Sequence, residues 1–205
     1  ASDVYKRQIE QDLARDYPMM RLVQGDVGSG KTLVAALAAL LAIDNGKQVA
    51  LMAPTEILAE QHANNFRRWL KPFGIEVGWL AGKVKGKARQ AELEKIKSGT
   101  VQMLVGTHAL FQEEVEFADL ALVIIDEQHR FGVHQRLMLR EKGEKAGFYP
   151  HQLIMTATPI PRTLAMTVYA DLDTSIIDEL PPGRTPITTV VISEERRNEI
   201  VARVK

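Results

Sequence analysis

The sequence contains no cysteine among its 205 residues. This absence excludes a disulfide framework and metal sites built from thiolates, and it suits the reducing interior of a cell. An excess of charge of one sign is also missing, because 26 lysines and arginines balance 26 aspartates and glutamates. The composition therefore does not indicate a basic surface over the whole chain, and any surface for nucleic acid must be local.

Long apolar runs are missing as well. No stretch reaches the roughly 18 residues of a membrane span, and the N-terminus lacks the apolar core of a signal peptide. We therefore expect a soluble cytoplasmic protein with no membrane partner. The length favours one large domain, or one domain with part of a second.

A glycine-rich stretch fits the phosphate-binding pattern G-x-x-x-x-G-K-[ST] at every fixed position. Its eight residues are Gly25, Asp26, Val27, Gly28, Ser29, Gly30, Lys31 and Thr32. The glycines let such a loop wrap a polyphosphate with its backbone N–H groups. We expect a nucleoside triphosphate here, with Lys31 on the β- and γ-phosphates and the Thr32 hydroxyl on Mg²⁺.

A glycine-rich turn without a ligand is the alternative explanation of this stretch. Its flanks favour the nucleotide, because a short apolar stretch at 20–24 precedes it and an alanine- and leucine-rich run at 33–42 follows it. Strand, loop and helix therefore come in the order that a nucleotide site requires, with the N-terminus of the helix facing the phosphates.

An acidic pair, Asp126 and Glu127, directly follows the apolar stretch 120–125. Ligands of α/β proteins bind at the carboxyl ends of the strands, so the pair lies near the phosphate loop if the strands 20–24 and 120–125 are neighbours. We expect Asp126 to hold Mg²⁺ through water and Glu127 to orient and deprotonate the attacking water. An ordinary turn into a helix is the alternative, and the phosphate loop makes it the weaker one, because nucleotide hydrolysis requires such a carboxylate.

Short apolar stretches alternate with helical patterns along the chain. This alternation predicts an α/β fold, a mostly parallel sheet with helices on both faces. The expected strands are 20–24, 48–53, 76–80, 101–105, 120–125 and 152–155, and the expected helices are 9–17, 33–42, 56–70, 88–97 and 133–145.

A basic cluster formed by Lys83, Lys85, Lys87 and Arg89 precedes the predicted helix 88–97. Either it is a solvated loop or it contacts a phosphate backbone, and the residues alone leave both explanations open.

Histidines and tryptophans give weaker signals. His108, His134 and His151 lack the cysteine or paired-histidine spacing of a zinc site, which favours packing or surface roles. We expect Trp69 and Trp79 to belong to the core, not to a platform on which bases stack.

Five segments occur in the order of the superfamily 2 helicase motifs. They are 25–32, 53–62, 105–110, 126–129 and 156–163. As a set they resemble the RecG family of branched-DNA translocases, and the resemblance covers nearly everything from about Ile9 onward. The Mfd family shares the Arg-Phe-Gly after the acidic motif and the run at 156–163, whereas the motif at 126–129 and the segment 179–186 look more like RecG.

This resemblance implies a RecA-like P-loop domain that uses ATP and Mg²⁺ and contacts the DNA backbone without reading bases. The residues that match backbone-gripping motifs are Pro54, Thr55, Gly106 and Thr107. We add Lys83 and Lys85 of the basic cluster to these candidate DNA contacts.

Four further residues resemble elements that couple the γ-phosphate to the DNA side. They are Gln128, His129, Thr156 and Thr158. For each threonine alone, a local cap or turn is an equally good explanation, and the complete set of motifs favours the coupling role.

The resemblance also divides the chain. Residues 1–8 are an uninformative segment that does not match the upstream glutamine-containing segment by which relatives recognise adenine, so the preference for ATP depends on the resemblance alone. Residues 9–180 form the first motor domain, 181–186 a linker, and 187–205 the truncated start of the second.

We therefore expect the ATP-binding motor lobe of a DNA helicase that remodels forks and junctions in recombination and repair, nearly inactive by itself. Its expected partners are branched DNA, the second motor lobe and a wedge domain. The alternatives are an Mfd-type translocase, which couples transcription to repair, and a nucleotide-binding regulatory module without motor action.

Overall fold

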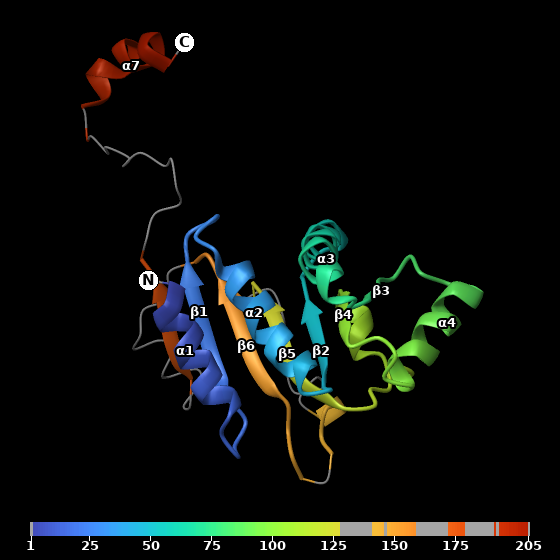
Figure 1. Cartoon of the computed structure of the whole chain (residues 1–205). Coiled ribbons are helices and arrows are strands. Elements are labelled where there is room, and N and C mark those ends of the chain that lie inside the picture. Colours follow the sequence, from blue (N-terminus) through green and yellow to red (C-terminus); the bar gives the residue numbers. More distant parts are fainter. Residues whose placement is uncertain are drawn as a thin grey trace.

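The computed structural model describes residues 2–127, 141–145, 147–158, 172–178, 191 and 193–204. These residues form one seven-stranded sheet in the order β3-β4-β2-β5-β6-β1-β7 (Figure 1). Neighbouring strands run parallel throughout. The predicted α/β class with a parallel sheet is confirmed.

The strands are β1 (Met20–Gly25), β2 (Gln48–Met52), β3 (Val77–Leu80), β4 (Met103–Gly106), β5 (Leu120–Asp126), β6 (His151–Thr156) and β7 (Asp173–Ile177). The helices are α1 (Ser2–Leu13), α2 (Lys31–Asp44), α3 (Glu56–Leu70), α4 (Gly86–Lys97) and α7 (Arg197–Val204), with short 3₁₀ turns η1 (Lys71–Phe73), η2 (His108–Phe111) and η4 (Glu194–Arg196). The six predicted strands are confirmed to within two residues at each end, whereas β7 was not predicted. The predicted helix 133–145 lies mostly outside the described residues.

Helices cover both faces of the sheet because successive side chains of each strand point to opposite sides. On β2, Val49 and Leu51 join the core beneath α1, α2 and α3. Ala50 and Met52 join a second core beneath α4 and η2. Trp69 and Trp79 pack against the first of these cores, which confirms the prediction made for them.

The N-terminal helix begins earlier than predicted. We expected a helix over 9–17 after an uninformative segment, but α1 begins at Ser2 and ends at Leu13. Hydrogen bonds from its carboxyl-terminal half attach the helix to the sheet. The Gln8 side chain accepts a hydrogen bond from the Ser175 hydroxyl at 2.8 Å. Within the described residues, none of the helices is long and apolar enough to cross a bilayer.

Candidate nucleotide and metal site

All the motifs that the sequence analysis singled out, where the structure describes them, follow the carboxyl ends of strands. Because the strands are parallel, these ends meet at one edge of the sheet, where α/β proteins bind ligands. The strands of the phosphate loop and the acidic pair are not direct neighbours, since β6 lies between β1 and β5. Gln24 pairs with Thr156, and Asp126 pairs with Met155, so β6 connects the two motifs.

The phosphate loop has the backbone that its glycines allow. Gly28 and Gly30 have positive φ angles of 83° and 96°, a region that other residues rarely adopt. Gly25 lies against β7, because a Cβ atom there would lie 3.0 Å from Cβ and 3.2 Å from the carbonyl oxygen of Ile177. Helix α2 begins at Lys31 directly after the loop, so its free N–H groups face the site.

The Lys31 ammonium group folds over the loop and donates to the carbonyl oxygens of Gly25 and Asp26 at 2.6 and 2.7 Å. Burial lowers the pKa of Lys31, and the negative charges of Asp126, Glu127 and Asp26 oppose that effect. The lysine and the acidic pair therefore lie at the same edge of the sheet, close enough for their charges to interact. The oxygens of a polyphosphate can replace these carbonyl oxygens as the hydrogen-bond acceptors of the ammonium group.

Asp126 ends β5 with its side chain only 14% exposed, and one of its oxygens lies 2.7 Å from Nε2 of His62. His62 belongs to α3 and is 8% exposed. The sequence analysis did not assign this histidine a role. A signal was available, because His62 interrupts the apolar buried stripe of α3 formed by Ala59, Ala63, Phe66 and Leu70.

Glu127 has a left-handed backbone with a φ of 50°, which is uncommon for a residue with a side chain. Its N–H donates to the carbonyl oxygen of Met155 at 2.9 Å. Its carboxylate accepts hydrogen bonds from the Thr156 hydroxyl at 3.2 Å and from the Ala157 N–H at 3.0 Å. Strained backbone of this kind occurs at functional sites, where surrounding contacts hold it in place.

Thr156 connects two of the predicted coupling residues. Its hydroxyl donates to Glu127 and accepts from the Thr158 N–H at 3.1 Å. The hydroxyl therefore acts both as a partner of the carboxylate and as a local turn contact, so the two explanations weighed for it are compatible. The other two coupling candidates, Gln128 and His129, lie outside the described residues.

The candidate DNA contacts surround the same edge of the sheet. Thr55 is exposed and caps α3, and its hydroxyl accepts from the Leu58 N–H at 3.3 Å. Pro54 precedes it and is half-buried. Lys83 pairs with Glu56, the first residue of α3, at 2.7 Å, which brings the basic cluster beside Thr55.

Gly106 and Thr107 are more enclosed than Thr55. A Cβ atom at Gly106 would lie 2.1 Å from the Leu80 carbonyl oxygen, so only glycine allows this approach of β3. Thr107 is 2% exposed, and its N–H donates to Leu80. Its buried hydroxyl has no hydrogen-bond partner within the described part of the chain. Lys85, by contrast, is exposed.

The site fits magnesium by its oxygen donors. Mg²⁺ binds in nucleotide sites through one or two carboxylates and the substrate phosphates and keeps several waters, so it needs no complete protein cage. Asp126 provides a carboxylate, and Thr32 provides a hydroxyl in the first turn of α2. Among the described residues, no cluster of three or more acidic, histidine or cysteine side chains forms such a cage.

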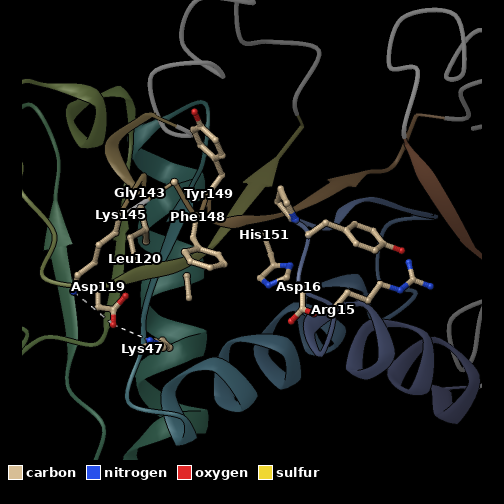
Figure 2. Close-up of a pocket in the computed structure, with 14 residues that line it drawn as sticks. Arg15, Asp16, Lys47, Asp119, Leu120, Gly143, Lys145, Phe148, Tyr149 and His151 are labelled. Carbon is tan, nitrogen blue, oxygen red and sulfur yellow. Dashed lines mark hydrogen bonds and ion pairs between the residues drawn. The ribbon is translucent and has the colours of Figure 1, made fainter.

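A cavity of about 550 Å³ lies at the other edge of the sheet, where the strands begin (Figure 2). Lys47 and Asp119, which line it, form an ion pair at 2.8 Å, and His151 and Phe148 border the same space. None of the predicted nucleotide or DNA residues lines this cavity. The predicted nucleotide residues and this cavity therefore lie at opposite edges of the sheet.

A phosphate loop and an acidic pair at one edge of a parallel sheet define a RecA-like nucleotide-binding domain. The family model of DEAD/DEAH box helicases matches residues 7–167, and the chain belongs to that family. Within the family the sequence is similar to RecG, as the motifs predicted. It is 94% identical over 197 residues to the ATP-dependent DNA helicase RecG of Haemophilus influenzae, covering 96% of this chain and 28% of that protein.

RecG of Escherichia coli K12 is 78% identical over 197 residues, with the same coverage. Among solved structures, RecG bound to a three-way DNA junction matches with a TM-score of 0.83 and 40% identity, covering 99% of this chain and 27% of that one. The Hef helicase domain of Pyrococcus furiosus shares the fold, with a TM-score of 0.63 at 22% identity, covering 87% of this chain and 38% of that one. The chain thus spans less than a third of the length of its RecG relatives.

Proposed function

We propose that the chain is the ATP-binding motor lobe of a DNA helicase that remodels forks and junctions in recombination and repair. The observation that carries this proposal is the convergence of the phosphate loop and the acidic pair at one edge of the sheet, where β6 pairs with both of their strands. High identity to proteins named ATP-dependent DNA helicase RecG, and the likeness to RecG bound to a three-way junction, support the DNA substrate. Because the RecG relatives come from bacteria, whose DNA lies in the cytoplasm, we place the action of this lobe there.

In this proposal the loop and Lys31 hold the triphosphate, because backbone N–H groups and an ammonium group complement its charge. Thr32 and Asp126 hold Mg²⁺, which neutralises charge on the phosphate oxygens when it is bound. Glu127 orients the attacking water and accepts its proton. The hydrogen bonds from Thr156 and Ala157 hold its carboxylate in one orientation at the site.

Coupling to DNA is assigned to the segment after β6 and to the motif at 126–129. A shift of Thr156 changes the donors around the Glu127 carboxylate, and so changes how well it can position water. Gln128, His129 and Thr158 are the other members of this group. Their role follows from the resemblance to helicase motifs.

The DNA backbone is proposed to lie along Pro54, Thr55, Gly106 and Thr107, with Lys83 and Lys85 at its side. Thr55 is exposed at the N-terminus of α3, where N–H groups favour phosphate. Lys83 is exposed beside it, although Glu56 neutralises part of its charge. Such contacts give binding that is independent of base sequence.

The chain is proposed to divide into a first motor domain at 9–180, a linker at 181–186 and the start of a second motor domain at 187–205. A second lobe and a wedge domain are its expected partners in the whole protein. The relatives are more than three times as long as the part matched here, which leaves room for both.

Calorimetric titration of the 205-residue protein with Mg·ADP and Mg·ATP tests the proposal. Lys31→Ala should abolish most of the affinity while the circular dichroism spectrum stays unchanged, because the substitution removes a charge at the ligand but leaves no core cavity. Lys71→Ala, at an exposed lysine beyond α3, is the matched control and should bind as the wild type does. Undiminished nucleotide affinity in a folded Lys31→Ala protein would refute the site, and DNA that leaves nucleotide affinity unchanged would favour a regulatory module.

A further inference from the structure

His62 contacts the metal carboxylate from a helix that belongs to neither nucleotide motif. Its Nε2 atom lies 2.7 Å from Asp126 Oδ2, and both side chains are largely buried. An ionised carboxylate only accepts hydrogen bonds, so Nε2 carries the hydrogen and donates it. The imidazole therefore holds one oxygen of the Asp126 carboxylate in place.

Packing alone does not explain a histidine at this position. The neighbouring members of the buried stripe on α3 are apolar, and an apolar side chain would satisfy the same core contacts. The other ring nitrogen, Nδ1, is buried and has no hydrogen-bond partner in the part of the chain that the structure describes. A buried nitrogen without a partner destabilises the fold, so the contact with Asp126 requires an explanation at the site itself.

We propose that His62 is a positioning residue that orients Asp126 for Mg²⁺. Side chains that hydrogen-bond to metal ligands fix the orientation of those ligands and strengthen metal binding. The proposal rests on the Mg·ATP site proposed above. His62 itself touches neither nucleotide nor metal, and it acts through the carboxylate.

Two substitutions separate this role from a structural one. The amide nitrogen of glutamine occupies the position of the histidine Nε2 atom, whereas that of asparagine occupies the position of Nδ1. His62→Gln therefore keeps a donor for Asp126, and His62→Asn lacks one at that point. His151→Gln is the control, because His151 is a second partly buried histidine whose Nδ1 accepts from the Met19 N–H at the opposite edge of the sheet.

The test is calorimetric titration with ADP over a range of Mg²⁺ concentrations, and again in EDTA. His62→Asn should raise the Mg²⁺ concentration needed for half-maximal strengthening of ADP binding by about 10–100-fold, the usual effect of losing such a contact. Its affinity for ADP in EDTA should stay within about twofold of the wild type. His62→Gln should recover most of the Mg²⁺ response, and His151→Gln should match the wild type.

A folded His62→Asn protein with a wild-type Mg²⁺ response would overturn the inference, as would equal losses in His62→Asn and His62→Gln. If His62→Asn does not fold, His62→Phe keeps the volume of the ring without a donor and replaces it in the same comparison. A wild-type protein that bound ADP equally with and without Mg²⁺ would instead overturn the proposed function. The two failures are therefore distinguishable.

Discussion

The ion pair between Asp12 and Arg21 gives a direct test of how α1 is held against the sheet. Asp12 is 1% exposed, and its Oδ2 atom lies 2.5 Å from Nε of Arg21 on β1. Arg21 is 7% exposed. Asp12→Ala would leave this guanidinium buried without its principal charge partner.

The cost can be estimated from the contacts that remain. Removing one member of a buried ion pair typically costs about 3–5 kcal/mol of unfolding free energy. Arg21 would still donate to the Ser175 hydroxyl at 2.7 Å and would lie 3.7 Å from the exposed carboxylate of Asp173. We therefore expect Asp12→Ala to lose about 3 kcal/mol, the lower end of that range. Asp12→Asn, which keeps a neutral acceptor, should lose less.

Urea denaturation followed by circular dichroism measures these losses as shifts of the transition midpoint at constant slope. Glu76→Ala is the control, because Glu76 and Lys95 form an ion pair of 2.7 Å between half-exposed side chains. Exposed pairs contribute little, so its midpoint should hardly move. The loss from Asp12→Ala should also shrink in an Arg21→Ala background. Equal small effects of Asp12→Ala and Glu76→Ala would refute the reasoning.

Three further outcomes follow from the site and its surroundings. DNA binding, measured by fluorescence anisotropy, should be weak and independent of base sequence. Neutralising Lys83, Lys85 and Lys87 together should flatten the dependence of this binding on salt. A tight, sequence-selective complex unaffected by salt would contradict this. Burial lowers the pKa of His151 below 6.5, so the unfolded chain binds more protons than the folded one. The free energy of unfolding should therefore fall as the pH drops below 6.5. Urea titrations at several pH values should show a flatter fall for His151→Gln. ATP hydrolysis by the 205 residues, measured as phosphate release, should barely exceed background and respond little to DNA. Adding the downstream lobe should restore DNA-stimulated turnover. In that longer protein, Glu127→Gln should abolish the turnover while ATP still binds.

Low ATP hydrolysis is expected because this lobe is not expected to supply the arginine that stabilises the transition state. Arginines that stabilise the transferring phosphoryl group contribute about 10³–10⁵ in turnover, and in two-lobed motors the second lobe is expected to supply one. A brisk DNA-dependent ATPase from the 205 residues alone would contradict that account. An arginine within this lobe would then have to perform the task.

Strand positions could be predicted because buried parallel strands are continuous apolar runs in the sequence. β5, in which the run from Leu122 to Ile125 is fully buried, is the plainest example. β7 was missed because it lies at the edge of the described sheet, beside β1, and mixes buried with exposed residues. Its sequence, Asp-Thr-Ser-Ile-Ile, contains too few apolar residues to stand out. α1 was misplaced because polar contacts from Asp12 and Gln8 help the buried Ile9 to fix its position, and polar contacts leave no apolar periodicity in the sequence.

The residues of the site were easier to predict than their contacts. Motifs at strand ends had to converge once the sheet was parallel, so the shared edge followed from the fold class. The strand order did not follow, and it inserts β6 between the loop and the acidic pair. The hydrogen bonds of Glu127 to Thr156 and Ala157 depend on that insertion, and so does the left-handed backbone they accompany.

Helix α3 extends from a candidate DNA contact to the acidic pair. Thr55 caps its exposed N-terminus, and His62, seven residues later, contacts Asp126. Seven residues of α-helix span about 10 Å. In the proposed function, α3 is the contiguous element between the candidate DNA contact at Thr55 and the candidate metal carboxylate of Asp126.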